Sequence, residues 1–281
     1  YIFGKNLFGM EGVGRRLSGV FGDEYIAGSY IQKFFIFMPY AILIYSAIKN
    51  KFFLQLVLLF IFAITLFGIL VSGNRVPLFF SIFALSLIFI YEKSLRKLIG
   101  SAFIIFLLSF SFLLKTNLEV YNHFHDFKNR STEFINYFQD RFSTSGNLKA
   151  KNVYIKEFES GLSTWQQNKT FGGGLKSFYF HCSSIEKDVM TKYIGSCNSH
   201  PHNYYLEIAA SLGIVGLFLI VMIFFMILTK SLRFLRFSNS TPQIRKIFIP
   251  FFIIFILEIF PLKTTGSFFT TLTGNFLFII L

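Results

Sequence analysis

Charged residues are scarce in this sequence. Only 15% of its 281 residues are charged and just 14 are acidic, whereas about a quarter of the residues in soluble domains are charged. Hydrophobic residues make up 53% of the chain, and 42 residues are Phe. This balance excludes an ordinary soluble domain and predicts a membrane protein.

Cysteine is nearly absent, and no CxxC spacing occurs. Cys182 and Cys197 lie 15 residues apart in one polar stretch. If this stretch faces an oxidising compartment, the even cysteine count favours a disulfide, and two buried thiols are the alternative. The missing CxxC spacing disfavours a metal site built on this cysteine pair.

Long apolar runs are frequent, and runs of roughly 17–25 residues can cross a bilayer as helices. We therefore expect an all-α, polytopic transmembrane bundle, with candidate spans at 29–47, 52–71, 76–91, 98–114, 204–228, 247–262 and 267–281. Breaks at Pro261, Gly266 and Gly274 favour one span plus a re-entrant or truncated one at the end. Because the chain opens on Tyr1 in a polar stretch without a signal peptide, we expect a C-terminal fragment of a larger polytopic protein.

Basic residues gather in three short loops between these runs. Ten of them stand there against one acid, Glu92: Lys49, Lys51, Lys93, Arg96, Lys97, Lys230, Arg233, Arg236, Arg245 and Lys246. Because cytoplasmic loops are enriched in Lys and Arg, we expect these loops in the cytoplasm and 1–28, 72–75 and 115–203 on the outer side. The net charge of +13 follows from this bias and from attraction to anionic lipids, without any nucleic-acid partner.

The 115–203 loop contains all five histidines, both cysteines and the only tryptophan. Its 116–160 half has the amphipathic pattern of helices, and the glycines of TFGGGLKSF, Gly172 and Gly174 among them, indicate a tight loop. The pairs His123–His125 and His200–His202 could each offer two imidazoles to one metal. An isolated HxH is a weak signal, so we expect no metal and no cofactor.

His202 is placed where a titratable group could act. Pro201 favours an extended His200, so the following apolar helix is expected to start around Asn203. A helix N-terminus attracts anions and favours the neutral form of a nearby imidazole, which is the form that a general base requires. Arginines of two other outer segments, Arg75 and the Arg15–Arg16 pair, could hold a diphosphate through paired hydrogen bonds; snorkelling to the interface is the alternative for Arg75.

Four motifs occur in a recognisable order: RRLSGVFGDE, SGNR opening a span, TFGGGLKSF, and HPHNYYLEIAASLGIVGL. In this order and membrane placement they resemble the O-antigen ligase and polymerase family of bacterial membrane glycosyltransferases. The likeness extends over nearly all of residues 1–281, with 115–203 as a periplasmic loop inside a single membrane domain. The sequence departs from the family at Asn74, where a small residue such as Ser is frequent.

The resemblance implies that a glycan moves from a polyprenyl-diphosphate donor, undecaprenyl diphosphate in bacteria, to a sugar hydroxyl on the outer face of the inner membrane. The acceptor is lipid A–core for a ligase and another lipid-linked glycan for a polymerase, and related members glycosylate proteins. His202 would be the base, with Asn203, His200, Gly172 and Gly174 in support. Arg16, Arg75 and Arg15 would hold the diphosphate, in direct displacement with inversion and without a metal.

A transporter of lipid-linked glycan is the alternative from another class. Such a protein would be expected to carry ionisable residues in mid-membrane. Only Glu258 qualifies clearly, and its neighbours Pro261 and Lys263 indicate a helix end instead. The sequence therefore favours the glycosyltransferase.

Overall fold

The computed structural model describes residues 18–21, 26–46, 48–142, 153–182, 197–237, 240–263 and 266–280. Within these ranges all regular elements are helices and no strand occurs, which confirms the all-α prediction. The described residues form two compact units. The first lies within Tyr1–His125 and Ser238–Leu257, and the second lies within Asp126–Phe237 and Glu258–Leu281.

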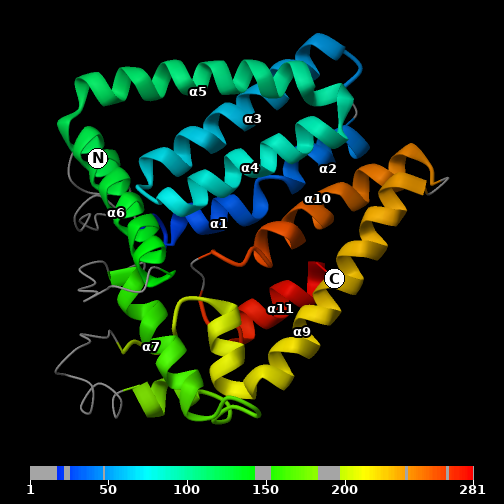
Figure 1. Ribbon diagram of the computed structural model, residues 1–281. Coiled ribbons are helices and arrows are strands. Elements are labelled where there is room, and N and C mark those ends of the chain that lie inside the picture. The colour runs from blue at the N-terminus through cyan, green and yellow to red at the C-terminus, as the bar shows by residue number, and fades with distance from the viewer. Residues whose placement is uncertain are drawn as a thin grey trace. The chain divides into compact units, whose positions relative to one another are not determined.

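The helices of the first unit follow the predicted apolar runs (Figure 1). They are α1 (Ala27–Phe34), α2 (Phe37–Tyr45), α3 (Lys51–Val71), α4 (Arg75–Tyr91), the short 3-10 helix η1 (Lys93–Leu95), α5 (Arg96–Thr116) and all but the last residue of α10 (Pro242–Glu258). Helix α3 packs against α1, α4 and α5. Aromatic contacts of Phe251 with Phe37 and of Phe252 with Tyr91 hold α10 against α2 and α4.

Helix α3 shows why these helices suit a membrane. Leu58, Phe62 and Ile69 recur at helical spacing on its buried face, where they pack in the core of the unit. Other faces carry exposed apolar side chains, such as Phe60 and Ile64. A helix that is apolar all round is stable when lipid rather than water covers its outward side.

Among the residues that the structure describes, four helical segments are long and apolar enough to cross a membrane: Ala27–Tyr45, Lys51–Val71, Lys93–Thr116 and Tyr204–Phe237. They confirm membrane-length helices at four of the predicted runs. Helix α4 is a shorter apolar helix of 17 residues. Helix α10 has the same length and contains Pro250, and α11 (Thr271–Ile280) has 10 residues, so the last predicted pair forms two short helices.

The second unit contains α7 (Val153–Gln167), α9 (Tyr204–Phe237), α11 and most of α6 (Leu118–Phe142). Helices α6 and α7 confirm that the 116–160 stretch is largely helical. Helix α9 continues past the apolar run predicted at 204–228 and ends at Phe237, so it includes residues assigned to a basic loop. Lys, Leu and Arg are good helix formers, and no Gly or Pro interrupts this stretch, so the helix has no reason to stop earlier.

Candidate functional site

Helix α9 begins at a side-chain cap. Asn203 Oδ1 accepts hydrogen bonds from the backbone N–H groups of Tyr205 (3.0 Å) and Leu206 (3.2 Å). These donors have no partner within the helix, so the cap stabilises its first turn. The Asn203 amide also donates to the carbonyl of Pro261 (2.7 Å). The helix therefore starts next to the predicted Asn203, and the residue before it is held in a defined place.

The segment after α10 anchors the first turns of α9. Glu207 accepts hydrogen bonds from the Ser267 hydroxyl (2.5 Å) and the Phe268 N–H (2.5 Å). Glu258 forms a buried ion pair with Lys263, with an Nζ–Oε1 distance of 2.5 Å. Glu258 is the last residue of α10, as the sequence indicates. These two carboxylates have local partners that fix the chain around the α9 N-terminus.

Helix α9 is interrupted at Gly213, where φ is 68° and ψ is −170°, and Figure 1 shows the bend. This conformation is essentially confined to glycine. Four backbone hydrogen bonds join the interruption to the 168–174 loop: Gly173 N–H to Ala210 O (2.9 Å), Gly174 N–H to Ser211 O (3.0 Å), Ile214 N–H to Lys169 O (2.8 Å) and Val215 N–H to Thr170 O (3.3 Å). The loop thus satisfies backbone groups that the broken helix leaves open.

The contact between loop and helix is close enough to require glycine on both sides. A Cβ at Gly213 would lie 2.1 Å from the Thr170 carbonyl oxygen, and one at Gly172 would lie 2.4 Å from the Ser211 carbonyl carbon. Gly174 has open space for a Cβ but a φ of 91°. The predicted tight loop therefore packs on the break in α9 and bonds its backbone. This contact explains why the sequence contains both the TFGGGL glycines and Gly213 of the histidine motif.

His202 directly precedes the capping residue and has a left-handed backbone with φ 50°. Such a conformation is uncommon outside glycine, and a residue held in it is a candidate for function. Its Nε2 lies 3.7 Å from Glu157 Oε1. The His202 side chain is 37% exposed, whereas that of Glu157 is 7% exposed. The imidazole can therefore meet a substrate while a buried carboxylate stands behind it.

Glu157 reaches His202 from α7, which packs beside the first turns of α9. Its Oε1 accepts a hydrogen bond from the Asn198 amide at 2.6 Å. Burial raises the pKa of Glu157, while His202 and the Asn198 hydrogen bond lower it. A carboxylate in this position stabilises an imidazolium, so it complements a histidine that accepts a proton.

His200 lies against His202, with 4.3 Å between their ring centroids. Its Nδ1 is hydrogen-bonded to the Ser199 hydroxyl at 2.9 Å. Pro201, between the two histidines, is buried and packs on α7, where a Cβ added at Gly161 would lie 3.0 Å from the Pro201 Cβ. The HPHN segment is thus packed on α7, and the His202 ring in it stays partly exposed.

Cys182 and Cys197 form a disulfide with a Cα–Cα distance of 5.6 Å. This separation lies within the usual disulfide range of about 4.4–6.8 Å. The bond joins a helical turn at 177–182 to the segment that leads into Asn198 and the two histidines. The cross-link therefore restrains the residue that bonds Glu157.

The arginines predicted to hold a diphosphate lie elsewhere in the chain. Arg75 is the first residue of α4 and is partly exposed, in the first unit. Arg15 and Arg16 lie outside the described residues. Convergence of Arg16, Arg75 and His202 on one cavity therefore stays a prediction. Within the described ranges no three His, Cys, Asp or Glu side chains form a group that could hold a metal ion.

Sequence reasoning missed Glu157 and Asn198. The signal for Glu157 was present in the α7 pattern, since Glu157 shares a helical stripe with Ser160, Gly161 and Thr164, and all four are buried. A carboxylate on a buried stripe of small residues needs a partner, and a histidine was the obvious candidate. Asn198 had no comparable signal, because its role depends on where the disulfide holds the chain.

Apolar helices of membrane length, together with a histidine–carboxylate pair at the start of the longest one, define an all-helical membrane protein with a titratable site. The O-antigen ligase family model matches residues 58–221, which is more than half of the chain, and the chain belongs to this family. The resemblance seen in the sequence is thereby confirmed. No curated protein and no solved structure shows a match. Family membership supports a glycosyltransferase-type membrane enzyme acting on lipid-linked glycans.

Proposed function

We propose that the protein transfers a glycan from a polyprenyl-diphosphate donor to a sugar hydroxyl, in the plasma membrane and on its outer face. The observation that carries this proposal is the His202–Glu157 pair, with Nε2 and Oε1 3.7 Å apart, inside the region matched by the family. Transfer to a hydroxyl needs such a base, because the hydroxyl is a poor nucleophile until a base accepts its proton.

In the proposed step the acceptor oxygen attacks the anomeric carbon of the donor sugar. A new C–O bond forms, and the bond to the diphosphate oxygen breaks with its electron pair leaving on the diphosphate. The hydroxyl proton passes to the exposed imidazole of His202, and Glu157 stabilises the resulting imidazolium. A direct displacement of this kind inverts the anomeric configuration. Glu157 touches His202 rather than substrate, so it is a positioning residue.

Arg75 and Arg16, with Arg15, are proposed to bind the leaving diphosphate. Guanidinium groups offer paired hydrogen bonds to phosphate and keep their charge, so they stabilise the negative charge that grows in the transition state. This arrangement requires no metal. It also requires that the 115–203 stretch and the segments carrying the arginines lie on one side of the membrane, as the basic loops indicate.

Ligation of O-antigen to lipid A–core in lipopolysaccharide synthesis is the particular reaction that we propose, with polymerisation of lipid-linked repeats or protein glycosylation as alternatives within the family. The glycans of cells that lack the protein distinguish these three reactions. Accumulated free lipid-linked polymer is expected for a ligase, whereas single repeat units on lipid A–core would indicate a polymerase. Glycoprotein loss with normal lipopolysaccharide would indicate a protein acceptor.

The catalytic assignment is tested by comparing His202→Ala with Arg75→Lys in purified membranes. His202→Ala should abolish transfer and leave donor binding intact, because the arginines remain. Arg75→Lys should weaken donor binding as well, because lysine loses the bidentate fork. Export of intact lipid-linked glycan by the His202→Ala protein would instead support a transporter. Near-normal transfer by that variant at normal abundance would overturn the assignment.

A further inference from the structure

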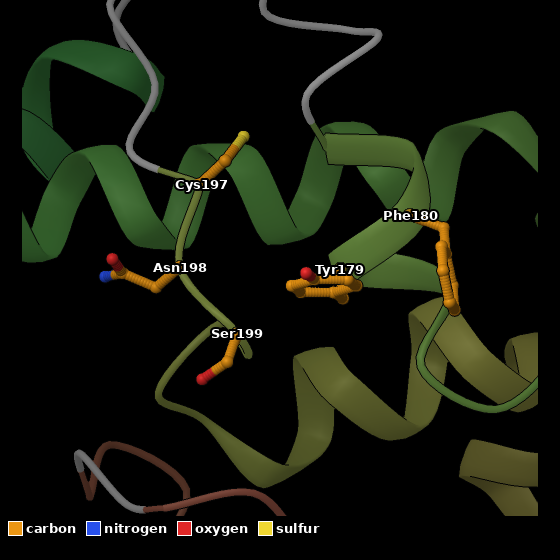
Figure 2. A pocket seen from close by; sticks show the side chains of 5 residues that line it. All are labelled: Tyr179, Phe180, Cys197, Asn198 and Ser199. Carbon is orange, nitrogen blue, oxygen red and sulfur yellow. The ribbon is translucent and has the colours of Figure 1, made fainter.

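A cavity of about 410 Å³ opens beside the histidine segment in the second unit. Among the described residues, five side chains line it, and they come from the helical turn at 177–182 and from the 197–199 segment: Tyr179, Phe180, Cys197, Asn198 and Ser199. In Figure 2 the Tyr179 ring lies between the 197–199 segment and Phe180, while the Asn198 side chain points away from it. The volume falls in the range of small-molecule sites, which is about 300–1,000 Å³.

A disulfide and a hydrogen bond restrain the two segments that line this cavity. The Cys182–Cys197 disulfide joins the two wall segments. The Ser177 hydroxyl donates to the carbonyl of Ala210 at 2.8 Å, and Phe178 is buried, so the helical turn is bound to the α9 backbone. A site whose walls are fixed in advance loses less entropy when it binds.

The chemistry of the lining selects a class of ligand. None of the five side chains that the structure describes in the lining carries a formal charge, so none of these five is suited to a diphosphate. Tyr179 and Phe180 are 57% and 66% exposed, and their rings are in edge contact at 5.2 Å. Exposed aromatic faces next to hydroxyl groups match a neutral sugar ring, which has C–H faces for the aromatics and hydroxyls around its edge.

Two short chains of contacts connect the cavity with the proposed base. Asn198 on its wall donates to Glu157 at 2.6 Å, and Glu157 lies 3.7 Å from His202. Ser199 on the same wall bonds His200, whose ring lies 4.3 Å from that of His202. The cavity wall is therefore linked to the His202 imidazole, the proposed acceptor of the proton, through Glu157 on one path and His200 on the other.

We propose that this cavity binds a neutral sugar ring of the acceptor glycan and presents its hydroxyl to His202. This inference rests on the proposed function, because it assigns the sugar to the acceptor on the ground that the base must contact the acceptor. The Tyr179 ring supplies the main packing surface. Ser199 and the Tyr179 hydroxyl supply hydrogen bonds.

Steady-state transfer kinetics of Tyr179→Ala in the full chain test this assignment. The acceptor KM should rise about 3- to 10-fold, the loss expected for one aromatic packing surface, while kcat and the donor KM stay within about twofold. Phe171→Ala is the matched control, since Phe171 is an exposed aromatic (77%) of the same unit that does not line the cavity. An unchanged acceptor KM for Tyr179→Ala, or an equal rise for Phe171→Ala, would overturn the proposal.

A binding measurement separates this inference from the proposed reaction. Ligand-observed NMR on the detergent-solubilised protein would use two probes, the core oligosaccharide released from lipopolysaccharide by mild acid and the free repeat-unit oligosaccharide. At least one should bind the wild type and His202→Ala equally, and bind Tyr179→Ala more weakly. Binding that disappears equally in all variants or never occurs contradicts the sugar site. Normal binding with normal transfer by His202→Ala would instead refute the base while leaving the sugar site standing.

Discussion

Helices α4 and α9 begin in similar ways but with different residues. Each is preceded by a residue with positive φ and then by an asparagine: Gly73 (φ 71°) and Asn74 before α4, His202 (φ 50°) and Asn203 before α9. Glycine adopts this backbone without penalty, whereas a side chain there costs about 1 kcal/mol or more. Glycine would fit the backbone at position 202 better than histidine. The presence of His202 there indicates that its side chain has a role beyond forming the turn.

The two asparagines differ as well. The Asn74 amide donates back to Ser72, to its carbonyl at 3.2 Å and its hydroxyl at 3.1 Å, and makes no cap to α4. Asn203 caps α9 and also holds Pro261. The Asn74 amide therefore bonds within its own turn, on which Gly28 of α1 packs closely, while the Asn203 amide ties the start of α9 to Pro261.

Replacing His202 with glycine, the residue found at the matching position before α4, should have the largest effect. Transfer should fall by about 10²–10⁴-fold, the usual contribution of a general base. The free energy of unfolding should change little, because relief of the positive-φ strain offsets loss of the Glu157 contact. Gly73→Ala should do the reverse, lowering stability by about 1 kcal/mol. Transfer assays with unfolding curves in detergent check both. A His202→Gly protein that loses activity only in proportion to its folded fraction would contradict the catalytic role.

Glu157→Gln should have the next largest effect. The amide keeps the shape and the contact with Asn198 but no longer stabilises a protonated His202. We expect kcat to fall about 10- to 100-fold, the loss seen when the carboxylate partner of a metal-bound histidine is replaced. The acid limb of the pH–rate profile should also shift to lower pH. A purely structural role would reduce activity without moving that limb, so the profile decides between the two.

Glu159, a second buried carboxylate of α7, should affect stability but not the transfer reaction. Burial raises the pKa of Glu159 from 4.5 to about 7. Folding therefore favours the neutral form of Glu159. The free energy of unfolding gains the full contribution of this group below about pH 4.5 and loses on the order of 2–3 kcal/mol as the pH rises through about 7. Glu159→Gln should therefore raise the melting temperature at pH 8 and change it little at pH 4.5, without affecting the transfer rate per folded molecule. An equal shift at both pH values would contradict this account.

The sequence predicted the helices and the start of α9 well, because both follow from local patterns. Apolar runs of membrane length and an asparagine after His-Pro-His are visible without any tertiary contact. The Gly172 loop was also predicted, yet its partner was not. Nothing in the sequence says that Gly172 faces a break at Gly213, since the break is stable only when the loop supplies its hydrogen bonds.

The partners of His202 show the same limit. Glu157 lies 45 positions earlier in the chain, and its place beside His202 depends on α7 packing against α9. The left-handed backbone of His202 lies between the buried Pro201, which packs on α7, and Asn203, which bonds Pro261. The Glu157 contact and the His202 backbone each depend on several long-range contacts, and none of these contacts has a pattern in the sequence that predicts it.

The smallest expected effect compares the two asparagines directly. Asn203→Ala should lower the free energy of unfolding by about 1 kcal/mol through loss of the cap, with a further loss from the Pro261 bond. Asn74→Ala should cost less, since its hydrogen bonds stay within one turn. Asn203→Asp then divides the two roles of Asn203, because a carboxylate still accepts from the Tyr205 and Leu206 N–H groups but cannot donate to Pro261.

If the tether to Pro261 orients His202, Asn203→Asp should unfold nearly like the wild type and still lose several-fold in kcat, with an unchanged donor KM. If the cap alone matters, Asn203→Asp should be fully active, because aspartate is as good a capping residue as asparagine. Unfolding curves and transfer kinetics on the three variants distinguish these outcomes. Equal losses for Asn74→Ala and Asn203→Ala in both measurements would remove the difference between the two helix starts.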